Sequence, residues 1–431
     1  MENTLKKSYI ILLAFSFLVP PLGSADVAIT HWLFFTLAAI IGISTTIYFD
    51  IFNENLKKIN SISLPIYSFL CFFLIAILSS FFAINFTESL ITILKISTIL
   101  IHIYLIYTLR VYDVFPLKVF LGIISLMLFL ETTASLYPVF NEILSVREYQ
   151  FNFTGFLKGF TGNKNITAAS ICIKIPFILM FINKSKNIYL RLILFLIVTI
   201  AVLNLFFLSS RATFLSLIII FVFYFFQKIF FELRRLGFFN LVKRFIYIPF
   251  IFIISFYVFD NNSKENDRSK IQNRVASISM QDESASQRIR YYTQAIVYAS
   301  QHPLMGTGIG NWKIKSVDVD KDNIYSYIIP YVMHNDFLEI LVETNLLGLL
   351  SYLLFFLSIY WILYKGYMKT KDVDLRDSLF LTACALTIYF IDANLNFPLY
   401  RPIMQINLLL ILIISLYLNL NIYKNENQKK L

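Results

Sequence analysis

The chain alternates between long apolar stretches and short polar connections. A helix that crosses the roughly 30 Å hydrocarbon core of a bilayer needs about 20 mainly apolar residues. Stretches of this kind recur along the sequence and predict about twelve transmembrane helices, near residues 9–22, 31–49, 64–84, 89–109, 115–137, 166–182, 188–208, 211–230, 245–260, 336–364, 376–395 and 399–422. The pattern therefore predicts an all-α, polytopic integral membrane protein.

One connection is much longer than a hairpin between two helices requires. Residues 261–333 are polar, mixed in charge and rich in tyrosine, and a loop of this length within a compact protein is usually functional. Inside it, residues 288–300 predict an amphipathic helix and residues 303–310 a tight turn. Three parts are thus expected: helices 1–9 over 1–260, a large loop over 261–333, and helices 10–12 with a C-terminal tail over 334–431.

The composition also indicates a membrane protein. Of the 431 residues, 58% are hydrophobic, compared with about 45–50% in an average soluble domain. This excess excludes a soluble fold. The three cysteines, Cys71, Cys172 and Cys384, lie in separate apolar runs without the spacing of a zinc site or a disulfide framework, and no metal or cofactor is expected.

Positive charge is distributed unevenly among the connections. The chain has 37 Lys+Arg and 26 Asp+Glu, a net charge of +11, which a membrane surface explains better than a nucleic acid. With a cytoplasmic N-terminus, the inner connections carry most of this charge, since the short outer connections hold only Arg147, Lys158, Lys164, Arg211 and Arg401. Basic residues favour the cytoplasmic side during insertion. Both termini are therefore expected inside, and the large loop outside.

Ionisable residues at membrane depth cost about 2.5–3.5 kcal/mol each on insertion scales, so each needs a reason. Arg211 follows Ser209 and Ser210 at the outer end of two helices that almost touch in sequence. Its guanidinium is expected at the outer interface. There it could anchor the helix end or hold phosphate oxygens in a bidentate manner.

Lys95 and Lys174 lie well inside predicted helices. The favoured interpretation makes them buried ion-pair partners of Glu131 or Asp392, because a charge in a low-dielectric setting needs a counter-charge.

His334 is a candidate for proton transfer. It lies where the large loop re-enters the membrane, and an imidazole with a pKa near 6.5 can accept a proton at neutral pH. A lone histidine is more often structural, so both roles stay open. His31, His102 and His302 are weaker candidates.

Glycine recurs in the turn Met305–Gly310, which superficially suggests a phosphate-binding loop. No strand precedes it, so the turn fails the structural context of a dinucleotide site. Flexible backbone beside a large ligand is the preferred interpretation.

Several segments in order resemble one known family. The large-loop region of the O-antigen ligase family is similar to Ser286-Gln287-Arg288, to His302–Trp312, and to His334-Asn335 with Leu338, Leu341, Glu343 and Gly348-Leu349-Leu350. Upstream, Gly162–Asn165 and Ser209-Ser210-Arg211 match further features. The resemblance covers about residues 155–400, and Asn345 departs from it where the family often has glycine. This family includes lipopolysaccharide ligases and is related to Wzy-type polymerases and bacterial O-oligosaccharyltransferases.

The resemblance implies a GT-C-type glycosyltransferase with a large periplasmic loop. Such an enzyme would move a glycan from undecaprenyl diphosphate to an acceptor hydroxyl, such as a lipid A-core sugar or another glycan or protein. The transfer would invert the anomeric carbon and need no metal. The site would face the periplasm in the inner (cytoplasmic) membrane, among membrane lipids and without nucleic acid.

Residue roles follow from the same resemblance. Arg211 and Arg288 would bind the donor diphosphate and stabilise the leaving group, while His334 would orient or deprotonate the acceptor hydroxyl. Arg401 is a further candidate anion contact, and Tyr331 and Trp312 are candidates for stacking on sugar rings, although interfacial anchoring is the commoner role of such aromatics.

Rival functions remain open from the sequence. A Wzy-type polymerase would use a second lipid-linked glycan as acceptor, and a protein O-oligosaccharyltransferase would use a protein. A lipid-linked oligosaccharide flippase or transporter is of another class, with Lys95, Lys174 and Glu131 along a translocation path. Against transport, the sequence shows no paired halves, and a long outer loop is unnecessary for it.

Overall fold

A computed structural model describes residues 1–20, 22–24, 26–49, 64–146, 157–237, 239, 247–262, 283–304, 306–324 and 332–428. Within these ranges the regular structure is helical and contains no strand. Each of the twelve predicted apolar segments overlaps a helix: α1 (Glu2–Phe15), α2 (Val27–Tyr48), α4 (Leu64–Ser80), α5 (Phe86–Thr108), α6 (Leu117–Val146), α7 (Lys164–Lys184), α8 (Ile188–Leu208), α9 (Arg211–Leu236), α11 (Tyr247–Asn262), α15 (Asp336–Lys369), α16 (Val373–Leu395) and α17 (Pro402–Gln428).

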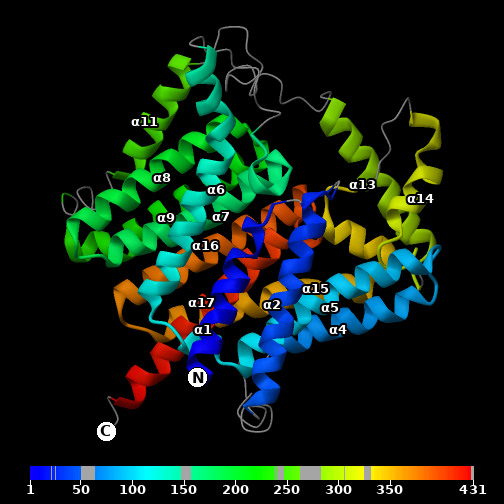
Figure 1. Ribbon diagram of the computed structural model, residues 1–431, viewed down its shortest axis with the longest axis horizontal. Helices are drawn as coiled ribbons and strands as arrows, with labels where there is room; N and C mark the ends of the chain where they lie inside the picture. Colours follow the sequence, from blue (N-terminus) through cyan, green and yellow to red (C-terminus); the bar gives the residue numbers. More distant parts are fainter. Residues whose placement is uncertain are drawn as a thin grey trace.

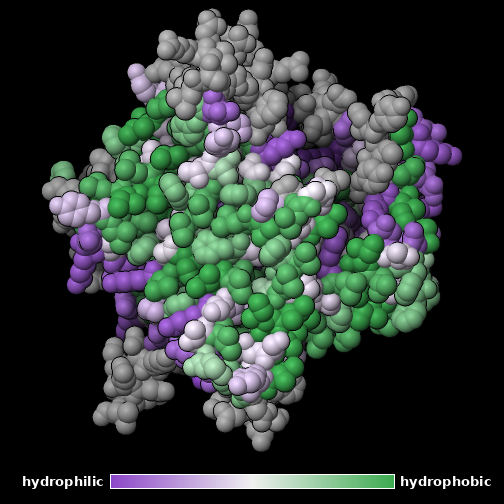
Figure 2. All heavy atoms as spheres, in the orientation of Figure 1, coloured by the Kyte–Doolittle hydropathy of each residue, from purple (hydrophilic) through white to green (hydrophobic). Residues whose placement is uncertain are grey.

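Nine helices in the described ranges are long and apolar enough to cross a membrane, and the apolar stretches of α4 and α11 are shorter. The outer helices expose large apolar side chains such as Ile218, Phe223 and Leu357, and Figure 2 shows hydrophobic residues over most of the visible face. A soluble protein does not expose such an extended apolar surface. The chain is therefore a multi-pass membrane protein.

Two helices depart furthest from their predicted ranges. The first helix was expected over 9–22, but α1 runs from Glu2 to Phe15. Lys6 pairs with Glu2 one turn earlier at 2.6 Å, which supports the polar start of the helix, and the chain leaves the α-helix before Pro20. The fifth segment was expected to end at 137, but α6 continues through Pro138 to Val146.

Helix starts are set by short polar side chains. The side-chain oxygen of the N-cap residue accepts backbone N–H groups of the first turn, which have no partner within the helix. Six helices begin in this way, at Asp26, Asn85, Asn163, Asn187, Asn335 and Asp372.

The large loop packs on one side of the bundle, here called the loop side. Its described parts are α13 (Glu283–Gln301), the turn residues 302–304 and 306–311, α14 (Trp312–Val319) and residues 320–324. The amphipathic helix predicted over 288–300 is therefore confirmed, with an earlier start. Figure 1 shows α13 and α14 at the upper right, while the start of α1 and the end of α17 lie together at the lower edge.

Contacts assign helix ends to the two sides. On the loop side, the Tyr292 hydroxyl on α13 donates to the carbonyl oxygen of Asn394 at the end of α16 (3.3 Å). On the opposite side, Asn183 near the end of α7 donates to Asp377 near the start of α16 (3.0 Å), and Tyr224 of α9 donates to the same carboxylate (3.3 Å). Consequently α7 and α9 begin on the loop side, where α16 ends.

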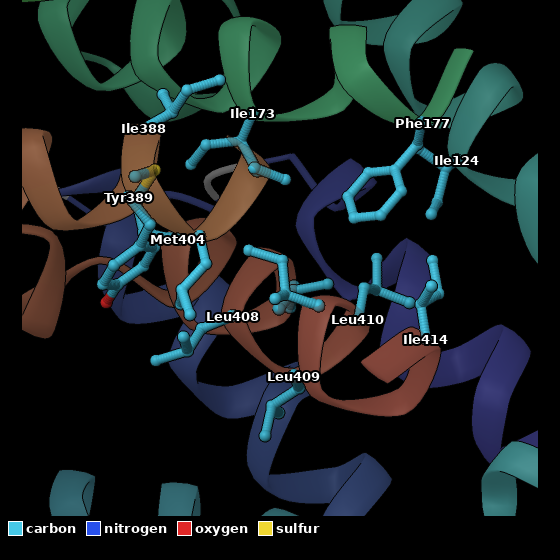
Figure 3. Close-up of a cluster of buried hydrophobic side chains, with 14 of the residues drawn as sticks. Ile124, Ile173, Phe177, Ile388, Tyr389, Met404, Leu408, Leu409, Leu410 and Ile414 are labelled. Carbon is cyan, nitrogen blue, oxygen red and sulfur yellow. The ribbon is translucent and has the colours of Figure 1, made fainter. Parts of the chain in front are cut away.

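The hydrophobic core lies around α7 and α17, whose apolar stretches are 94% and 89% buried. Figure 3 shows their side chains meeting those of α16 and α6. The labelled residues are Ile124, Ile173, Phe177, Ile388, Tyr389, Met404, Leu408, Leu409, Leu410 and Ile414.

A buried ion pair crosses this core. Lys174 of α7 lies 2.8 Å from Glu131 of α6, and Ser170 donates to the other oxygen of that carboxylate (2.8 Å). Asn407 of α17 donates in turn to the Ser170 hydroxyl (3.0 Å). The predicted pairing of Lys174 with Glu131 is thus confirmed, whereas Lys95 faces different neighbours, described below.

Candidate functional site

His334 ends the large loop directly before α15. Its backbone is left-handed (φ 58°), a strained conformation for a residue other than glycine. Two contacts hold it in place. The Tyr292 hydroxyl donates to the carbonyl oxygen of His334 at 2.9 Å, and the next residue, Asn335, caps α15 by accepting the Leu338 N–H at 3.0 Å.

The imidazole of His334 is half-buried and packs edge-on against Phe397, with ring centroids 5.3 Å apart. Its Nδ1 atom is buried and has no hydrogen-bond partner among the described residues. Buried polar atoms in folded proteins are nearly always paired, so an unpaired nitrogen at this position is unusual.

Arg288 lies close to this imidazole. It is on α13, one turn before Tyr292. Burial, followed by the positive charge of Arg288, lowers the pKa of His334 from 6.5 to about 4. Burial raises the pKa of Tyr292, and the charge of Arg288 opposes this shift. Arg288 also acts on the carboxylate of Asp392. The structure therefore brings together two of the predicted catalytic residues, a neutral imidazole beside a cation.

Arg211 is the first residue of α9 and its side chain is exposed. The helix before it ends at Ser209 in a left-handed conformation (φ 50°), which allows the sharp reversal between α8 and α9. Because α9 begins on the loop side, Arg211 shares this side of the bundle with His334 and Arg288.

Arg401 contacts the same ring, that of Phe397, as His334 does. Its guanidinium carbon is 4.9 Å from the centroid of that ring, and its Nη1 atom is 3.5 Å from the carboxylate of Asp26. Burial lowers the pKa of Arg401, and the charge of Asp26 opposes this shift. The guanidinium Nε is buried without a hydrogen-bond partner among the described residues.

The two candidate aromatic contacts have different outcomes. Trp312 is only 2% exposed and packs edge-on against Tyr298, with ring centroids 6.0 Å apart. Its ring is enclosed by protein, which favours a structural role over stacking on a sugar. Tyr331 lies outside the described residues.

The glycine turn packs against neighbouring backbone, which corrects the interpretation of a flexible loop beside a ligand. A Cβ atom on Gly306 would collide with the backbone of Val342 and Glu343. On Gly308 (φ 87°) it would lie 2.5 Å from the Cα of Ala83, and on Gly310 (φ 77°) it would meet Thr92. Only residues without a side chain fit between α15 and the α4–α5 hairpin.

This turn does bind an anion, which the protein itself supplies. The backbone N–H groups of Gly310 and Trp312 each donate to the Glu343 carboxylate at 2.8 Å. The chain thereby fills the anion-binding position that the glycine pattern suggested.

The helix α15 is broken where the turn meets it. Asn345 adopts φ 67° and ψ −172°, and its side chain donates to the Leu304 carbonyl oxygen at 2.9 Å. The break releases the carbonyl groups of the preceding turn. That of Val342 accepts the Thr307 N–H (2.9 Å) and that of Glu343 accepts the Gly308 N–H (3.1 Å). Asn345, where the O-antigen ligase family often has glycine, is thus the residue at which the helix breaks.

Comparison with known protein families supports the resemblance. Residues 192–353 match the O-antigen ligase family. This segment is similar to an O-antigen ligase domain. It runs from α8 into α15 and contains Arg211, Arg288 and His334, so the predicted resemblance is confirmed. No curated protein matches the chain.

Two residues that contact the candidate site residues were not singled out in the sequence. Tyr292 holds the His334 backbone, and Phe397 contacts both His334 and Arg401. Tyr292 had a signal, because it lies four residues after Arg288 and therefore on the same helix face. Phe397 had none, since α16 ends far from His334 in the sequence. The fully described part of the chain contains no group of three His, Cys, Asp or Glu side chains that could hold a metal ion.

Proposed function

We propose that the chain is a glycosyltransferase that moves a glycan from undecaprenyl diphosphate to an acceptor hydroxyl, as an O-antigen ligase. The observation that carries this proposal is that Arg288 lies near enough to His334 for its charge to help lower the histidine pKa, within the segment similar to O-antigen ligases. The site would face the periplasm at the inner membrane, and the fold would be of the GT-C type. The positive charge of the opposite side, which includes Lys365, Lys369 and Lys371, supports this orientation.

In the proposed reaction the acceptor oxygen attacks the anomeric carbon as the bond to the diphosphate oxygen breaks. The electron pair of that bond leaves with the diphosphate, and configuration at the anomeric carbon inverts. Arg288 and Arg211 would stabilise the charge that grows on the leaving group, because preorganised cations in a water-poor site are worth more than in water. The proton of the acceptor hydroxyl would pass to His334.

The lowered pKa of His334 constrains this proton transfer. An imidazole with a pKa of about 4 is a weak base. A bound diphosphate would neutralise Arg288 and place negative charge nearby, and both effects favour the protonated imidazole. Donor binding would therefore strengthen the base, so that His334 is activated only when a glycan is present to be transferred.

The test is glycan transfer by purified protein from an undecaprenyl diphosphate oligosaccharide to a panel of acceptors, with EDTA present. We expect His334→Ala to lower the rate about 10²–10⁴-fold, the usual contribution of a general base. We expect Arg288→Ala to lower it about 10²–10³-fold, as for a lost transition-state donor. His302→Ala is the matched control, because His302 is an exposed loop histidine that stacks on Tyr298.

Transfer that survives EDTA and disappears in both folded variants supports the proposed reaction and residues. Full activity in both variants would contradict them. The acceptor panel then separates ligation to a lipid A-core sugar from polymerisation on a second lipid-linked glycan and from protein glycosylation. In cells that lack the protein, a missing ligase leaves long lipid-linked chains, whereas a missing polymerase leaves single units.

A further inference from the structure

Lys95 is a cation within a membrane helix that has no counter-ion of its own. It lies on the third turn of α5 and is half-buried. Its amine is 6.0 Å from the ring centroid of Trp32, which is near the outer limit of a cation–π contact. Among the described residues it forms no hydrogen bond and no ion pair. Lys174, at a similar depth in α7, has Glu131 as its partner.

The charged groups around Lys95 do not neutralise its positive charge. Lys313 of α14 and Arg401 act on it as like charges, and Asp26 and Glu88 as opposite charges. Both carboxylates are engaged elsewhere, because Glu88 lies 2.5 Å from the Lys313 amine and Asp26 lies 3.5 Å from Arg401. Three cations thus share two carboxylates, and the unmatched charge falls on Lys95.

Other carboxylates near this group have their own donors. Lys313 also acts on Glu339 and Glu343 of α15. Glu343 accepts the two N–H groups of the glycine turn. Glu339 accepts the Met333 N–H (3.4 Å) and interacts with the Tyr400 hydroxyl. The charges that act on Lys95 are those of Lys313, Asp26, Glu88 and Arg401.

Arg401 adds a second unmet donor. Its Nε is buried without a partner, although guanidinium groups normally bind anions through several N–H groups. The Trp32 indole, which lies under the Lys95 amine, donates to the carbonyl oxygen of Tyr400 (3.3 Å), so Lys95 and Arg401 are held beside each other by adjoining residues.

We propose that Lys95, Arg401 and Lys313 form a binding site for a phosphate group of a membrane lipid. The site is distinct from the one that Arg288 and Arg211 offer to the donor diphosphate. One phenyl ring, Phe397, contacts a residue of each site, with its centroid 5.3 Å from that of the His334 ring and 4.9 Å from the Arg401 guanidinium carbon. A phosphate bound here would hold a glycolipid acceptor near His334, because Phe397 contacts both His334 and Arg401. The assignment to the acceptor rests on the proposed glycan transfer, whereas phosphate binding does not.

The first experiment measures the acceptor KM of the full-length protein in phosphatidylcholine nanodiscs, using lipid A-core with and without its lipid A phosphates. Loss of a charge-assisted contact corresponds to about a tenfold weaker affinity. In Lys95→Gln we therefore expect the KM of the phosphorylated acceptor to rise about tenfold with little change in the donor KM. The dephosphorylated acceptor should have the same KM in both proteins. Lys95→Arg should keep most of the affinity.

The second experiment needs no catalysis. Wild type and Lys95→Gln are placed in nanodiscs that contain phosphatidylglycerol, and the lipid retained after extraction is measured by native mass spectrometry. Reduced retention without a KM effect assigns the site to a phospholipid headgroup, and a KM effect assigns it to the acceptor. Lys315→Gln is the matched control, since Lys315 is a surface lysine of α14 that pairs with Asp318.

Thermal stability excludes a purely structural role. Lys95→Gln removes a cation that two others repel, so its melting temperature should equal or exceed that of wild type. Unchanged acceptor KM and unchanged phosphatidylglycerol retention in Lys95→Gln would overturn the site. If the wild type transfers no glycan to any acceptor, the proposed function fails, while retention still decides whether phosphate binds.

Discussion

His334 combines a strained backbone with an unpaired ring nitrogen. A left-handed conformation costs a non-glycine residue on the order of 1–3 kcal/mol and persists only where the surroundings impose it. Here the Tyr292 hydroxyl and the Asn335 cap impose it. The position of the imidazole is therefore set by groups that need not contact the substrate, and Nδ1 is left without a hydrogen-bond partner among the described residues.

The pH dependence of transfer should report the environment of His334. Transfer requires the neutral imidazole, so activity is lost as pH falls through the pKa of His334. In the free enzyme this pKa is about 4, and kcat/KM for the donor should decline only near that pH. In the donor-bound enzyme the diphosphate offsets Arg288, so the acidic decline of kcat should lie at higher pH.

These pH–rate profiles distinguish two environments. An acidic decline near the ordinary value of 6.5 in kcat/KM would contradict burial of His334 beside Arg288. Coinciding declines in both profiles would contradict activation by the donor. In His302→Ala, which changes an exposed histidine, both profiles should match those of wild type.

At the scale of elements, the turn 306–310 and the broken helix α15 form one interlocked unit. The turn supplies N–H groups to Val342, to Glu343 and to the Glu343 carboxylate. It also reaches the α4–α5 hairpin, where the Ser79 hydroxyl accepts the Ile309 N–H at 3.1 Å. This unit joins the large loop to the membrane helices and fixes α13, which carries Arg288.

Glycine-to-alanine substitutions should destabilise the protein in this tightly packed turn but not in an open position of a helix. In Gly308→Ala the new Cβ would lie 2.5 Å from the Cα of Ala83 at a φ of 87°. We expect a loss of on the order of 2–4 kcal/mol in the free energy of unfolding, measured by thermal unfolding in detergent, together with reduced transfer.

The matched control is Gly122→Ala in α6, where no atom lies within 4 Å of the new Cβ. Alanine is a better helix former than glycine by roughly 1 kcal/mol, so this variant should be unchanged or slightly more stable. Equal stability of the Gly308 and Gly122 variants would show that the turn does not pack as described.

The elements were predictable from sequence to different degrees. The twelve apolar segments and the amphipathic helix α13 were visible because hydrophobic runs and periodicity are local signals. The role of the glycine turn was not, because its partners Val342 and Ala83 come from distant parts of the chain. The same limit applies to Lys95, whose depth was evident but whose neighbours Lys313 and Arg401 are brought to it only by the fold.

On the scale of the whole molecule, polar groups gather at the two sides of an apolar bundle. The loop side holds His334, Arg288, Arg211 and Arg401. The opposite side holds a buried pair of Lys228 with Asp377, 2.5 Å apart. The apolar surface between them (Figure 2) matches a bilayer, so the two sides would face different compartments.

Cysteine labelling should establish which side is outside. In a Cys71→Ala background, which removes the exposed native cysteine, Ser300→Cys places a thiol on an exposed position of α13, and Lys371→Cys places one between α15 and α16. With the outer membrane removed, a membrane-impermeant maleimide should label Ser300→Cys directly and Lys371→Cys only after permeabilisation. The reverse pattern would place the site in the cytoplasm.

The break at Asn345 also bears on how the protein is made. Residues 306–310 are synthesised before α15, so the turn can already have crossed the bilayer when the first half of that helix arrives. The carbonyl groups that the break releases would then find the Thr307 and Gly308 N–H groups in place, instead of meeting lipid unsatisfied. With this order of synthesis, the turn 306–310 would be in place before α15 packs against it. The loop would then have to cross the membrane before α15 can adopt its final position.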